Sequence, residues 1–290
     1  MATVLQILSY GIINGSMYGL VALGLSLVFG VMSYLNVAHG ALIVLGAYAS
    51  FWLFHLFHLD PFLSILIVAP MFFVLGLALF KGLFGSLAEF PEQDKIKNSL
   101  LISFGILLIV PNMAILLWTP DERAVTVWYS GKVLAALGWR LPYIGLATLV
   151  LSCAVISAMH LFLTRTYFGK AIRAVSQDHE AAGLMGINVN QTYIISFAIG
   201  VALAAVPGAL ISFQGFNPEL AFELTNKALV VVILAGVGSI NGLLIGGILL
   251  GLIESAGVFL LGAAYREAIG LAIFVLFLIF RPQGLMGKKA

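Results

Sequence analysis

Charged residues are scarce in this sequence. Only 9% of the 290 residues are Asp, Glu, Lys or Arg, whereas 62% are hydrophobic and the mean hydropathy is +1.12. A soluble domain carries about 25% charged residues, because its surface must face water. The composition therefore predicts an integral membrane protein. The formal net charge of +2 is too small to indicate nucleic-acid binding.

The sequence is also poor in cysteine and lacks the common catalytic motifs. The single cysteine, Cys153, lies in an apolar run, which excludes a disulfide framework. The chain has no Cys and His cluster with metal-ligand spacing, no GxxxxGK[ST] phosphate loop and no GxSxG nucleophile elbow. We therefore expect no catalytic residues, no metal site and no cofactor on this chain.

Long hydrophobic runs, by contrast, are abundant. A helix needs about 20 residues to cross the roughly 30 Å hydrocarbon core. The sequence predicts an all-α polytopic membrane protein with about eight transmembrane helices (seven to nine), some broken or re-entrant, in one permease domain over 1–290. The short run 226–238 either crosses or is re-entrant. The other predicted spans are 5–30, 40–58, 62–80, 99–118, 141–163, 191–213, 241–262 and 268–281.

Glycines and prolines within these runs favour close packing and irregular helices. The segment GLLIGGILLG contains two pairs of glycines four residues apart, Gly242 with Gly246 and Gly247 with Gly251. Small residues at this spacing let helix backbones approach in a membrane. Prolines inside spans remove backbone hydrogen bonds and favour kinks, which suits a transporter better than a plain anchor. These prolines are Pro70, Pro111 and Pro207.

Lysine and arginine in short loops predict which ends face the cytoplasm. The segments 81–98 and 164–190 and the C-terminal tail each carry several, so we expect all three to be cytoplasmic. Loop 119–140 is an exception: it carries three basic residues, yet alternation of the flanking spans places it outside. The side of the N-terminus depends on whether 226–238 crosses.

Asn36 and His39 stand at the joint between two hydrophobic runs, in NVAHGALIVLGAY. Because they are three residues apart, one helical turn would bring them to nearly the same side, with Gly40 able to break the helix. An unpaired amide in hydrocarbon costs several kcal/mol, so both side chains need partners. Three interpretations stay open: contacts with carbonyls freed at the break, a pathway lining that contacts the solute, or a proton-coupling histidine.

Glu254 lies deep in a predicted span, and an intramembrane carboxylate is a functional candidate by default. The alternative is a paired or protonated structural group, with Lys227 as a possible partner. In GSMYGL, Gly15, Ser16 and Tyr18 either supply a pathway hydroxyl or form a small-residue packing face.

A fourth candidate is LAGVGSING, which contains Gly236, Gly238, Ser239 and Asn241. Broken helices in transporters point backbone dipoles at their ligands, which makes this segment a candidate part of the pathway. The alternative is a tight turn between two packed helices.

The segment 164–190 favours a helix from Lys170 to Met185, ended by a C-cap glycine. Ile172, Val175 and His179 recur on one side of that helix. It is either an amphipathic connecting helix on the membrane or a docking helix held by a cytoplasmic partner. The residues expected to form the docking surface are Arg173, Gln177, Asp178, Glu180, Ala181, Ala182, Leu184 and Gly186.

Four motifs in register carry a resemblance to a known family. EAAGLMGIN resembles the coupling loop of ATP-binding-cassette importer permeases. Together with GIINGSMYGLVALGLSLVFGVMSYLNVAHG, LAGVGSINGLLIGGILLGLIES and RPQGLMG, it resembles permease subunits of branched-chain amino-acid importers, in the hydrophobic amino-acid uptake family. The closer match is to the H-type (LivH-like) subunit rather than the longer M-type. The motifs cover nearly the whole chain.

The sequence also departs from the family pattern. Ala235 replaces a glycine, Asn241 a proline and Ala41 an acidic residue, and 81–98 lacks an R-P-L-R sequence. These departures leave the identity of the solute open, because the family includes importers for urea, short amides and aromatic acids.

The resemblance implies a set of partners. These are a second permease (LivM-like), two ATPases that hold ATP and Mg²⁺, and an external solute-binding protein. The chain would form half of the pathway in a bacterial or archaeal cytoplasmic (inner) membrane, with the helix 170–185 as coupling element. A stand-alone secondary transporter or channel is the alternative, although it needs intramembrane charges that are few here. A membrane-embedded enzyme lacks paired carboxylates.

Overall fold

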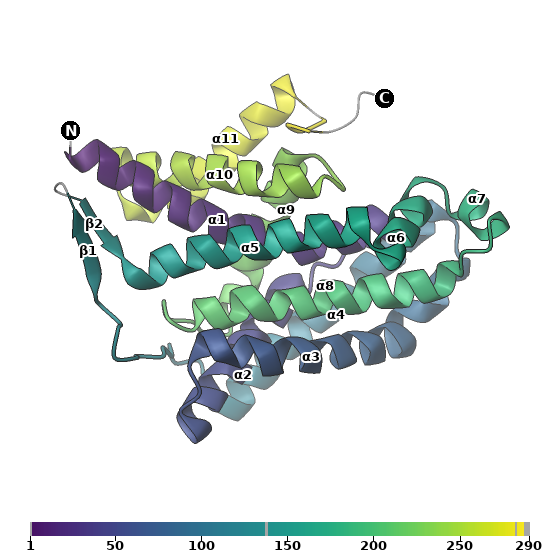
Figure 1. The fold of residues 1–290 in the computed structure, drawn as a ribbon, viewed down its shortest axis with the longest axis horizontal. Helices are drawn as coiled ribbons and strands as arrows, with labels where there is room; N and C mark the ends of the chain where they lie inside the picture. The colour runs from purple at the N-terminus through teal and green to yellow at the C-terminus, as the bar shows by residue number, and fades with distance from the viewer. Residues whose placement is uncertain (1, 137–138, 282, 287–290) are drawn as a thin grey trace. The chain divides into compact units, whose positions relative to one another are not determined.

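The computed structural model describes residues 2–136, 139–281 and 283–286. Eight of its helices are long and apolar enough to span a membrane, which confirms the predicted all-helical polytopic fold for this part of the chain. Two short strands, β1 (Val133–Ala136) and β2 (Trp139–Pro142), form an antiparallel hairpin in the segment 119–140 (Figure 1).

The helices follow the hydrophobic runs of the sequence closely. The short predicted run 226–238 belongs to α9, whose 16 residues fall below the about 20 needed to cross the hydrocarbon core. The helices are α1 (Ala2–Met32), α2 (His39–Phe57), α3 (Pro61–Leu79), α4 (Glu92–Trp118), α5 (Tyr143–Arg165), α6 (Tyr167–Gln177), α7 (His179–Leu184), α8 (Val189–Ile211), α9 (Leu220–Ala235), α10 (Ile240–Leu261) and α11 (Arg266–Phe280), with short turns of other helix types at Phe80–Phe84, Gly85–Glu89 and Ala263–Tyr265.

The chain divides into two compact units, each assembled from separate stretches of sequence. The first unit comprises Met1–Leu23, Thr126–Ala158 and Lys227–Ala290. The second unit comprises Gly24–Val125 and Met159–Asn226. Three of the unit boundaries fall within α1, α5 and α9, and the fourth lies between Val125 and Thr126 in the segment 119–140.

Glycine contacts between α1 and α10 hold the first unit together. A Cβ atom added at Gly247 would lie 2.4 Å from the carbonyl oxygen of Gly15, and one at Gly251 would lie 2.3 Å from that of Gly11. No side chain fits in either place without moving a backbone. The two helices therefore touch through their main chains, as small residues allow in membranes.

The other glycine pair on α10 faces α9. A Cβ atom at Gly242 would lie 2.6 Å from the carbonyl oxygen of Ala235, and one at Gly246 would lie 3.2 Å from the amide nitrogen of the same residue. The two packing stripes predicted from the spacing of four glycines are thus confirmed, one against α1 and the other against α9.

The second unit is built around α8, which packs against α2 and α3. A Cβ atom at Gly208 of α8 would lie 2.5 Å from the carbonyl oxygen of Ile43 in α2, and one at Gly76 of α3 would lie 2.7 Å from Ala198 Cα. Asp60 begins α3 by accepting a hydrogen bond from the Phe62 amide at 2.9 Å. Close backbone contacts therefore fix this helix trio as well.

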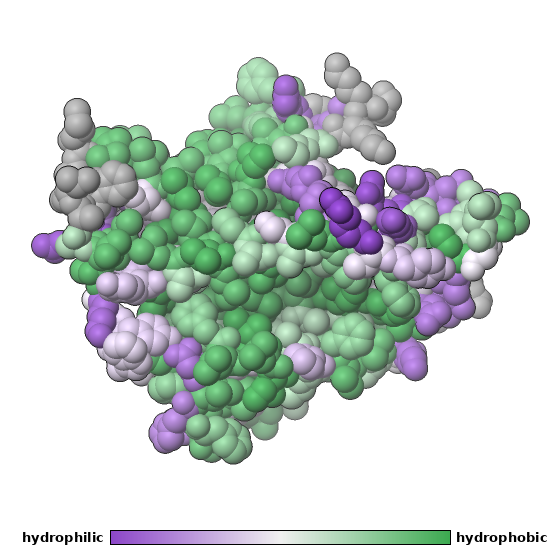
Figure 2. Space-filling model, viewed as in Figure 1, coloured by the Kyte–Doolittle hydropathy of each residue, from purple (hydrophilic) through white to green (hydrophobic). Residues whose placement is uncertain are grey.

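The outward face of the second unit is apolar. Leu66 of α3 is 74% exposed and Leu116 of α4 is 81% exposed. Figure 2 shows hydrophobic residues along α3 and hydrophilic residues gathered around α6. An exposed apolar surface of this extent is unfavourable in water, so these faces are fitted to lipid.

The α1–α10 contact leads to a stability prediction. Gly247→Ala forces a methyl group into the Gly15 and Gly19 backbone, so we expect it to destabilise the fold by about 1–3 kcal/mol. Gly105→Ala is the matched control, because nothing lies within 4 Å of a Cβ atom at Gly105. Thermal unfolding in detergent, followed by size-exclusion chromatography, checks both. Equal midpoints for the two variants would contradict the packing.

Candidate functional site

The segment 164–190 contains two helices, where the sequence predicted one over 170–185. The chain becomes extended at Asp178, with φ −157° and ψ 107°, between α6 and α7. Its carboxylate Oδ1 accepts hydrogen bonds from the amides of Glu180 and Ala181, both at 2.9 Å, and so begins α7. A single helix was predicted because the flanking residues favour helix; the capping side chain overrides them.

The break also separates residues that were expected to share one face. Ile172 and Val175 on α6 are buried, at 2% and 3% exposure, and anchor α6 to the second unit. His179 is the first residue of α7 and is exposed. The prediction that all three lie on one helical side is therefore wrong.

The end of α7 agrees with the sequence. Gly186 has φ +85°, its amide donates to the Gly183 carbonyl at 3.0 Å, and the amide of Ile187 donates to the Ala182 carbonyl at 3.1 Å. This pair of bonds is a Schellman motif, which stops a helix at a glycine.

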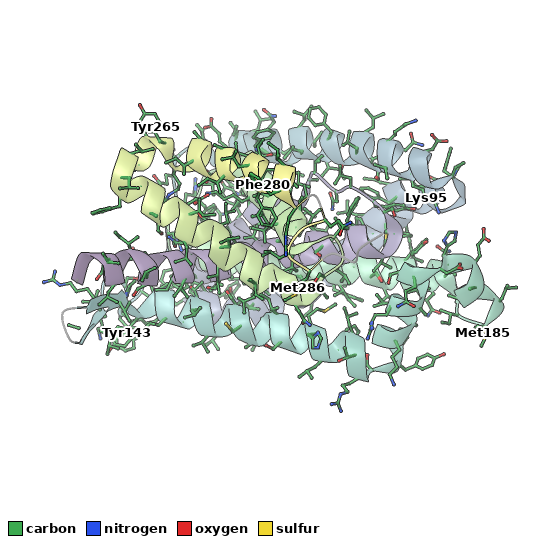
Figure 3. The ribbon with its side chains drawn as sticks, turned by 90° about the horizontal axis from the view of Figure 1, so that it is seen from above. Lys95, Tyr143, Met185, Tyr265, Phe280 and Met286 are labelled. Atoms are coloured by element: carbon green, nitrogen blue, oxygen red, sulfur yellow. The ribbon has the colours of Figure 1, made fainter. Side chains whose placement is uncertain are left out.

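The tip of α7 presents apolar side chains to solvent. Leu184 is 89% exposed and Met185 is 84% exposed, whereas Ala182 is buried at 5%. Met185 lies at the far end of this segment in Figure 3. The capped tip therefore offers two large apolar side chains to a partner.

The linker between α1 and α2 places Asn36 outside any helix. Asn36 Oδ1 accepts a hydrogen bond from the amide of Ala38 at 3.1 Å, and His39 is the first residue of α2. The predicted shared helical turn is therefore wrong, and so is the predicted break at Gly40, which is the second residue of a continuous helix. The Asn36 side chain meets a local amide rather than a freed carbonyl.

The start of α2 lies inside the second unit, level with the middle of α8. A Cβ atom at Gly24 would lie 2.7 Å from His39 Cε1 and 2.4 Å from the carbonyl oxygen of Gly200, which is near the centre of α8. Asn36 and His39 are each 2% exposed. The linker therefore carries polar backbone into the interior, where its groups need protein partners.

Side chains from α4 and α9 supply those partners. Ser103 Oγ accepts from the amide of Val37 at 3.1 Å and donates to the carbonyl of Leu35 at 3.0 Å. Thr225 Oγ1 accepts from the amide of Gly40 at 3.0 Å and lies 2.9 Å from the carbonyl oxygen of Val37. The sequence did not predict that either hydroxyl bonds the linker, because serine and threonine give no distinctive signal within apolar runs.

In the first unit, Tyr18 and Glu254 are directly bonded. The phenol of Tyr18 donates to Glu254 Oε2 at 2.6 Å, and Glu254 is 4% exposed. The Lys227 ammonium lies 5.0 Å from the centroid of the Tyr18 ring. The intramembrane carboxylate thus belongs to a buried polar cluster, with Gly15 and Ser16 on the same helix as Tyr18.

The segment LAGVGSING forms a turn between α9 and α10. Gly236 and Gly238 have φ +93° and +77°, and Ser239 Oγ accepts from the amide of Gly242 at 3.3 Å to begin α10. Asn241 is exposed on the first turn of α10. The segment after α11 joins this turn, because the Leu285 amide donates to the Leu234 carbonyl at 2.8 Å. Two of the four sequence motifs therefore meet here.

Among the described residues, no group of three or more His, Cys, Asp and Glu side chains is placed to hold a metal ion. In the first unit, the candidate pathway residues include Tyr18 with Glu254 and the turn at 236–241. In the second unit, Asn36, His39 and Gly40 lie at the start of α2.

Thr225 provides a test of the buried linker. Thr225→Val keeps the shape but leaves the Gly40 amide without its acceptor, so we expect a loss of about 1–3 kcal/mol in unfolding free energy. Thr148→Val is the control, since Thr148 is equally buried but its hydroxyl has no partner among the described residues. Thermal unfolding in detergent measures both, and a loss of similar size in each would refute the role of Thr225.

Tyr18 provides a second test. Tyr18→Phe removes the hydrogen bond to a buried carboxylate, and we expect a loss of about 1.5–3 kcal/mol. Tyr10→Phe, on the same helix at 42% exposure, is expected to change little. Chemical unfolding in mixed micelles compares the two; an unaltered Tyr18→Phe variant would mean that the bond contributes nothing net.

Comparisons with known proteins agree with this architecture. A family model described as "Branched-chain amino acid transport system / permease component" matches residues 7–279. The high-affinity branched-chain amino acid transport permease protein BraD of Pseudomonas aeruginosa is 30% identical, over 98% of this chain and 96% of its own. LivH of Escherichia coli is 28% identical over the same shares, and a probable LivH of Methanocaldococcus jannaschii is 29% identical over 97% and 92%.

No solved structure matches the chain. Because the family model covers nearly all of the sequence and BraD aligns along its full length, the chain belongs to the branched-chain amino acid transport permease family, as a multi-pass membrane component of an ATP-binding-cassette system that is not itself an ATPase.

Proposed function

We propose that this chain forms half of the translocation pathway of an ATP-driven importer for branched-chain or other hydrophobic amino acids. The family match over residues 7–279, with relatives named for branched-chain amino acid transport, carries the proposal. Partner subunits hydrolyse ATP with Mg²⁺, which is consistent with the lack of a phosphate loop in this sequence.

The partners are a second, LivM-like permease, two ATPases and an external solute-binding protein. The membrane is the cytoplasmic membrane of a bacterium or archaeon, and the lysine- and arginine-rich segments 81–98 and 164–190 face the cytoplasm. The ATPases therefore meet the segment that contains α6 and α7.

The geometry of α6 and α7 supports their role as coupling element. α6 is tied to α5, because Gly169 packs against the Phe162 carbonyl and its amide donates to Thr166 Oγ1 at 3.0 Å. α7 is capped at both ends, so it is a stiff projection with an apolar tip. A short helix with exposed apolar residues suits insertion into a groove of a partner. A push on the tip then reaches α5 and the core of the second unit as a rigid-body motion.

Within the membrane, the proposal places the pathway beside the linker that begins α2. This linker brings Asn36, His39 and Gly40 level with the middle of α8, where a non-helical segment leads into α2. Irregular backbone at membrane depth occurs where it is buried in protein or lines a pathway. Tyr18 and Glu254 form the polar support in the first unit.

The apolar tip of α7 is the direct test of this function. Leu184→Gln with Met185→Gln is expected to lower co-purification of the ATPases at least tenfold and to abolish ATP-driven uptake, while the fold persists because both side chains are exposed. Tyr167→Gln, at 79% exposure on the first turn of α6, is the control and is expected to keep both.

Two outcomes would contradict the proposal. One is full uptake by the double variant. The other is solute accumulation by vesicles that contain this chain without ATPases, which would indicate a stand-alone transporter.

A further inference from the structure

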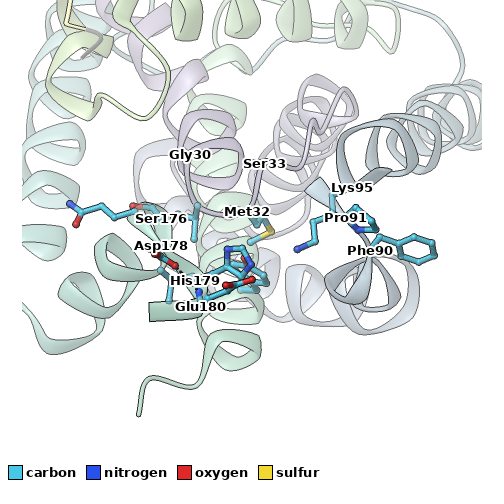
Figure 4. Close-up of a pocket in the computed structure, with 14 residues that line it drawn as sticks. Gly30, Met32, Ser33, Phe90, Pro91, Lys95, Ser176, Asp178, His179 and Glu180 are labelled. Atoms are coloured by element: carbon cyan, nitrogen blue, oxygen red, sulfur yellow. Dashed lines mark hydrogen bonds between the residues drawn. The ribbon is translucent and has the colours of Figure 1, made fainter. Parts of the chain in front are cut away.

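A recess opens beside the junction of α6 and α7 in the second unit. Its volume is about 580 Å³, within the range of about 300–1,000 Å³ for small-molecule sites. Figure 4 shows its lining, which comes from the end of α1, the start of α4 and the α6–α7 junction, together with Tyr193 of α8. The proposed function assigns no role to this recess.

Lys95 is the unusual group in the lining. It is only 7% exposed, yet its ammonium forms no hydrogen bond or ion pair with any described side chain. The ammonium lies 5.9 Å from the centroid of the Tyr193 ring, which is near the limit for a cation–π interaction. Two residues along α4, Lys97 is 74% exposed and pairs with Asp94 at 3.7 Å. Because Lys95 lines the recess, its ammonium can bind an anionic group that enters the recess.

The α6–α7 junction carries carboxylates in the same lining. Asp178 and Glu180 both line the recess, and no described group pairs with the Glu180 carboxylate. Asp178 uses Oδ1 to cap α7, which leaves its second oxygen available. The described lining of the recess therefore includes one ammonium, two carboxylates and the imidazole of His179.

This mixture of charge restricts the ligand. A simple anion such as phosphate is attracted to Lys95 but repelled by the two carboxylates. A simple cation is attracted to the carboxylates but repelled by Lys95. A molecule with a carboxylate and an ammonium on neighbouring atoms satisfies both, since each charge finds an opposite partner. Buried Met32, Val175 and Tyr193 add an apolar surface for a hydrocarbon side chain.

We infer that this recess is a second site for a free amino acid, one that takes the zwitterionic main chain of a hydrophobic amino acid from the cytoplasmic side. The ligand carboxylate binds Lys95 and its ammonium binds Glu180 and Asp178. The identity of the solute and the cytoplasmic position of the recess rest on the proposed function. The site differs from the proposed membrane pathway, because its lining residues come from the ends of α1, α4 and α8 and from the coupling segment and do not include Asn36, His39 or Gly40.

Binding of tritiated L-leucine to the complete importer in lipid nanodiscs, without its external solute-binding protein, tests the inference. Two analogues separate the charges: leucinamide lacks the carboxylate and 4-methylpentanoate lacks the ammonium. We expect saturable leucine binding, with each analogue competing at least tenfold more weakly than unlabelled leucine.

Substitutions assign each charge to its partner. Lys95→Met is expected to weaken leucine binding at least tenfold and to reduce the difference in affinity between leucine and leucinamide. Glu180→Gln is expected to weaken leucine binding several-fold and to reduce the difference in affinity between leucine and 4-methylpentanoate. Lys97→Met is the matched control, because Lys97 is exposed and lies outside the recess. We expect its affinity to remain within twofold of the wild-type value.

The inference is overturned if Lys95→Met binds leucine normally, if either analogue competes as well as leucine, or if wild-type protein binds no leucine while receptor-dependent uptake is intact. If Lys95→Met fails to assemble, the exposed Glu180→Gln variant and the wild-type comparison of analogues decide the question. Failure of the proposed function gives a different result: the wild-type importer takes up no hydrophobic amino acid when its external solute-binding protein is present. The analogue comparison needs no uptake and still judges the recess.

Discussion

Backbone groups and charged side chains inside the hydrocarbon need partners within the protein, and this constraint organises the structure. An unsatisfied group there costs several kcal/mol, because no water is present to bond it. The linker before α2 meets the constraint with hydroxyls brought from other helices, Ser103 of α4 and Thr225 of α9. Glu254 meets it with the phenol of Tyr18 at 2.6 Å. In each place a polar side chain joins segments that are far apart in sequence, so the same bond satisfies a buried group and fixes a tertiary contact.

The helix contacts obey a different rule, since lipid is as apolar as the helices and gives no hydrophobic driving force between them. Packing must then come from close approach, which explains why α1 and α10 meet through Gly15 and Gly247. The same reasoning applies to α2 and α8, where Gly208 lies against the backbone of Ile43. These contacts are short-ranged and sensitive to a single methyl group. The scaffold around the buried polar groups is therefore stiff at defined points, which suits the proposed transmission of movement from the coupling segment.

Much of this fold is readable from the sequence, because hydrophobic run length determines a membrane span. The predicted spans 40–58 and 241–262 differ by one residue at each end from α2 and α10. The prediction failed where a helix continues beyond its hydrophobic run: α4 begins at Glu92 rather than at 99, since polar helical residues carry no hydropathy signal. It also failed at Asp178, where one side chain caps a helix and ends the run of helix-favouring neighbours. Glycine spacing predicted the packing stripes correctly. The partners of Asn36 and His39 could not be predicted, because they depend on which helices become neighbours.

The contrast between Glu254 and Lys95 shows why burial alone does not indicate function. Both are charged residue types with less than a tenth of their surface exposed, at 4% and 7%. Glu254 accepts a short bond from a fixed phenol, so its surroundings are complete without a ligand. Lys95 lies 5.9 Å from the ring centroid of Tyr193, forms no ion pair with another described residue, and borders a recess lined by acidic residues on another segment. A polar cluster whose groups are bonded to one another stabilises the fold, whereas an incomplete cluster, whose charged groups border an open recess, can bind a ligand. The incomplete cluster lies at the α6–α7 junction, the segment assigned to coupling, so occupancy of the recess and movement of that segment involve the same side chains.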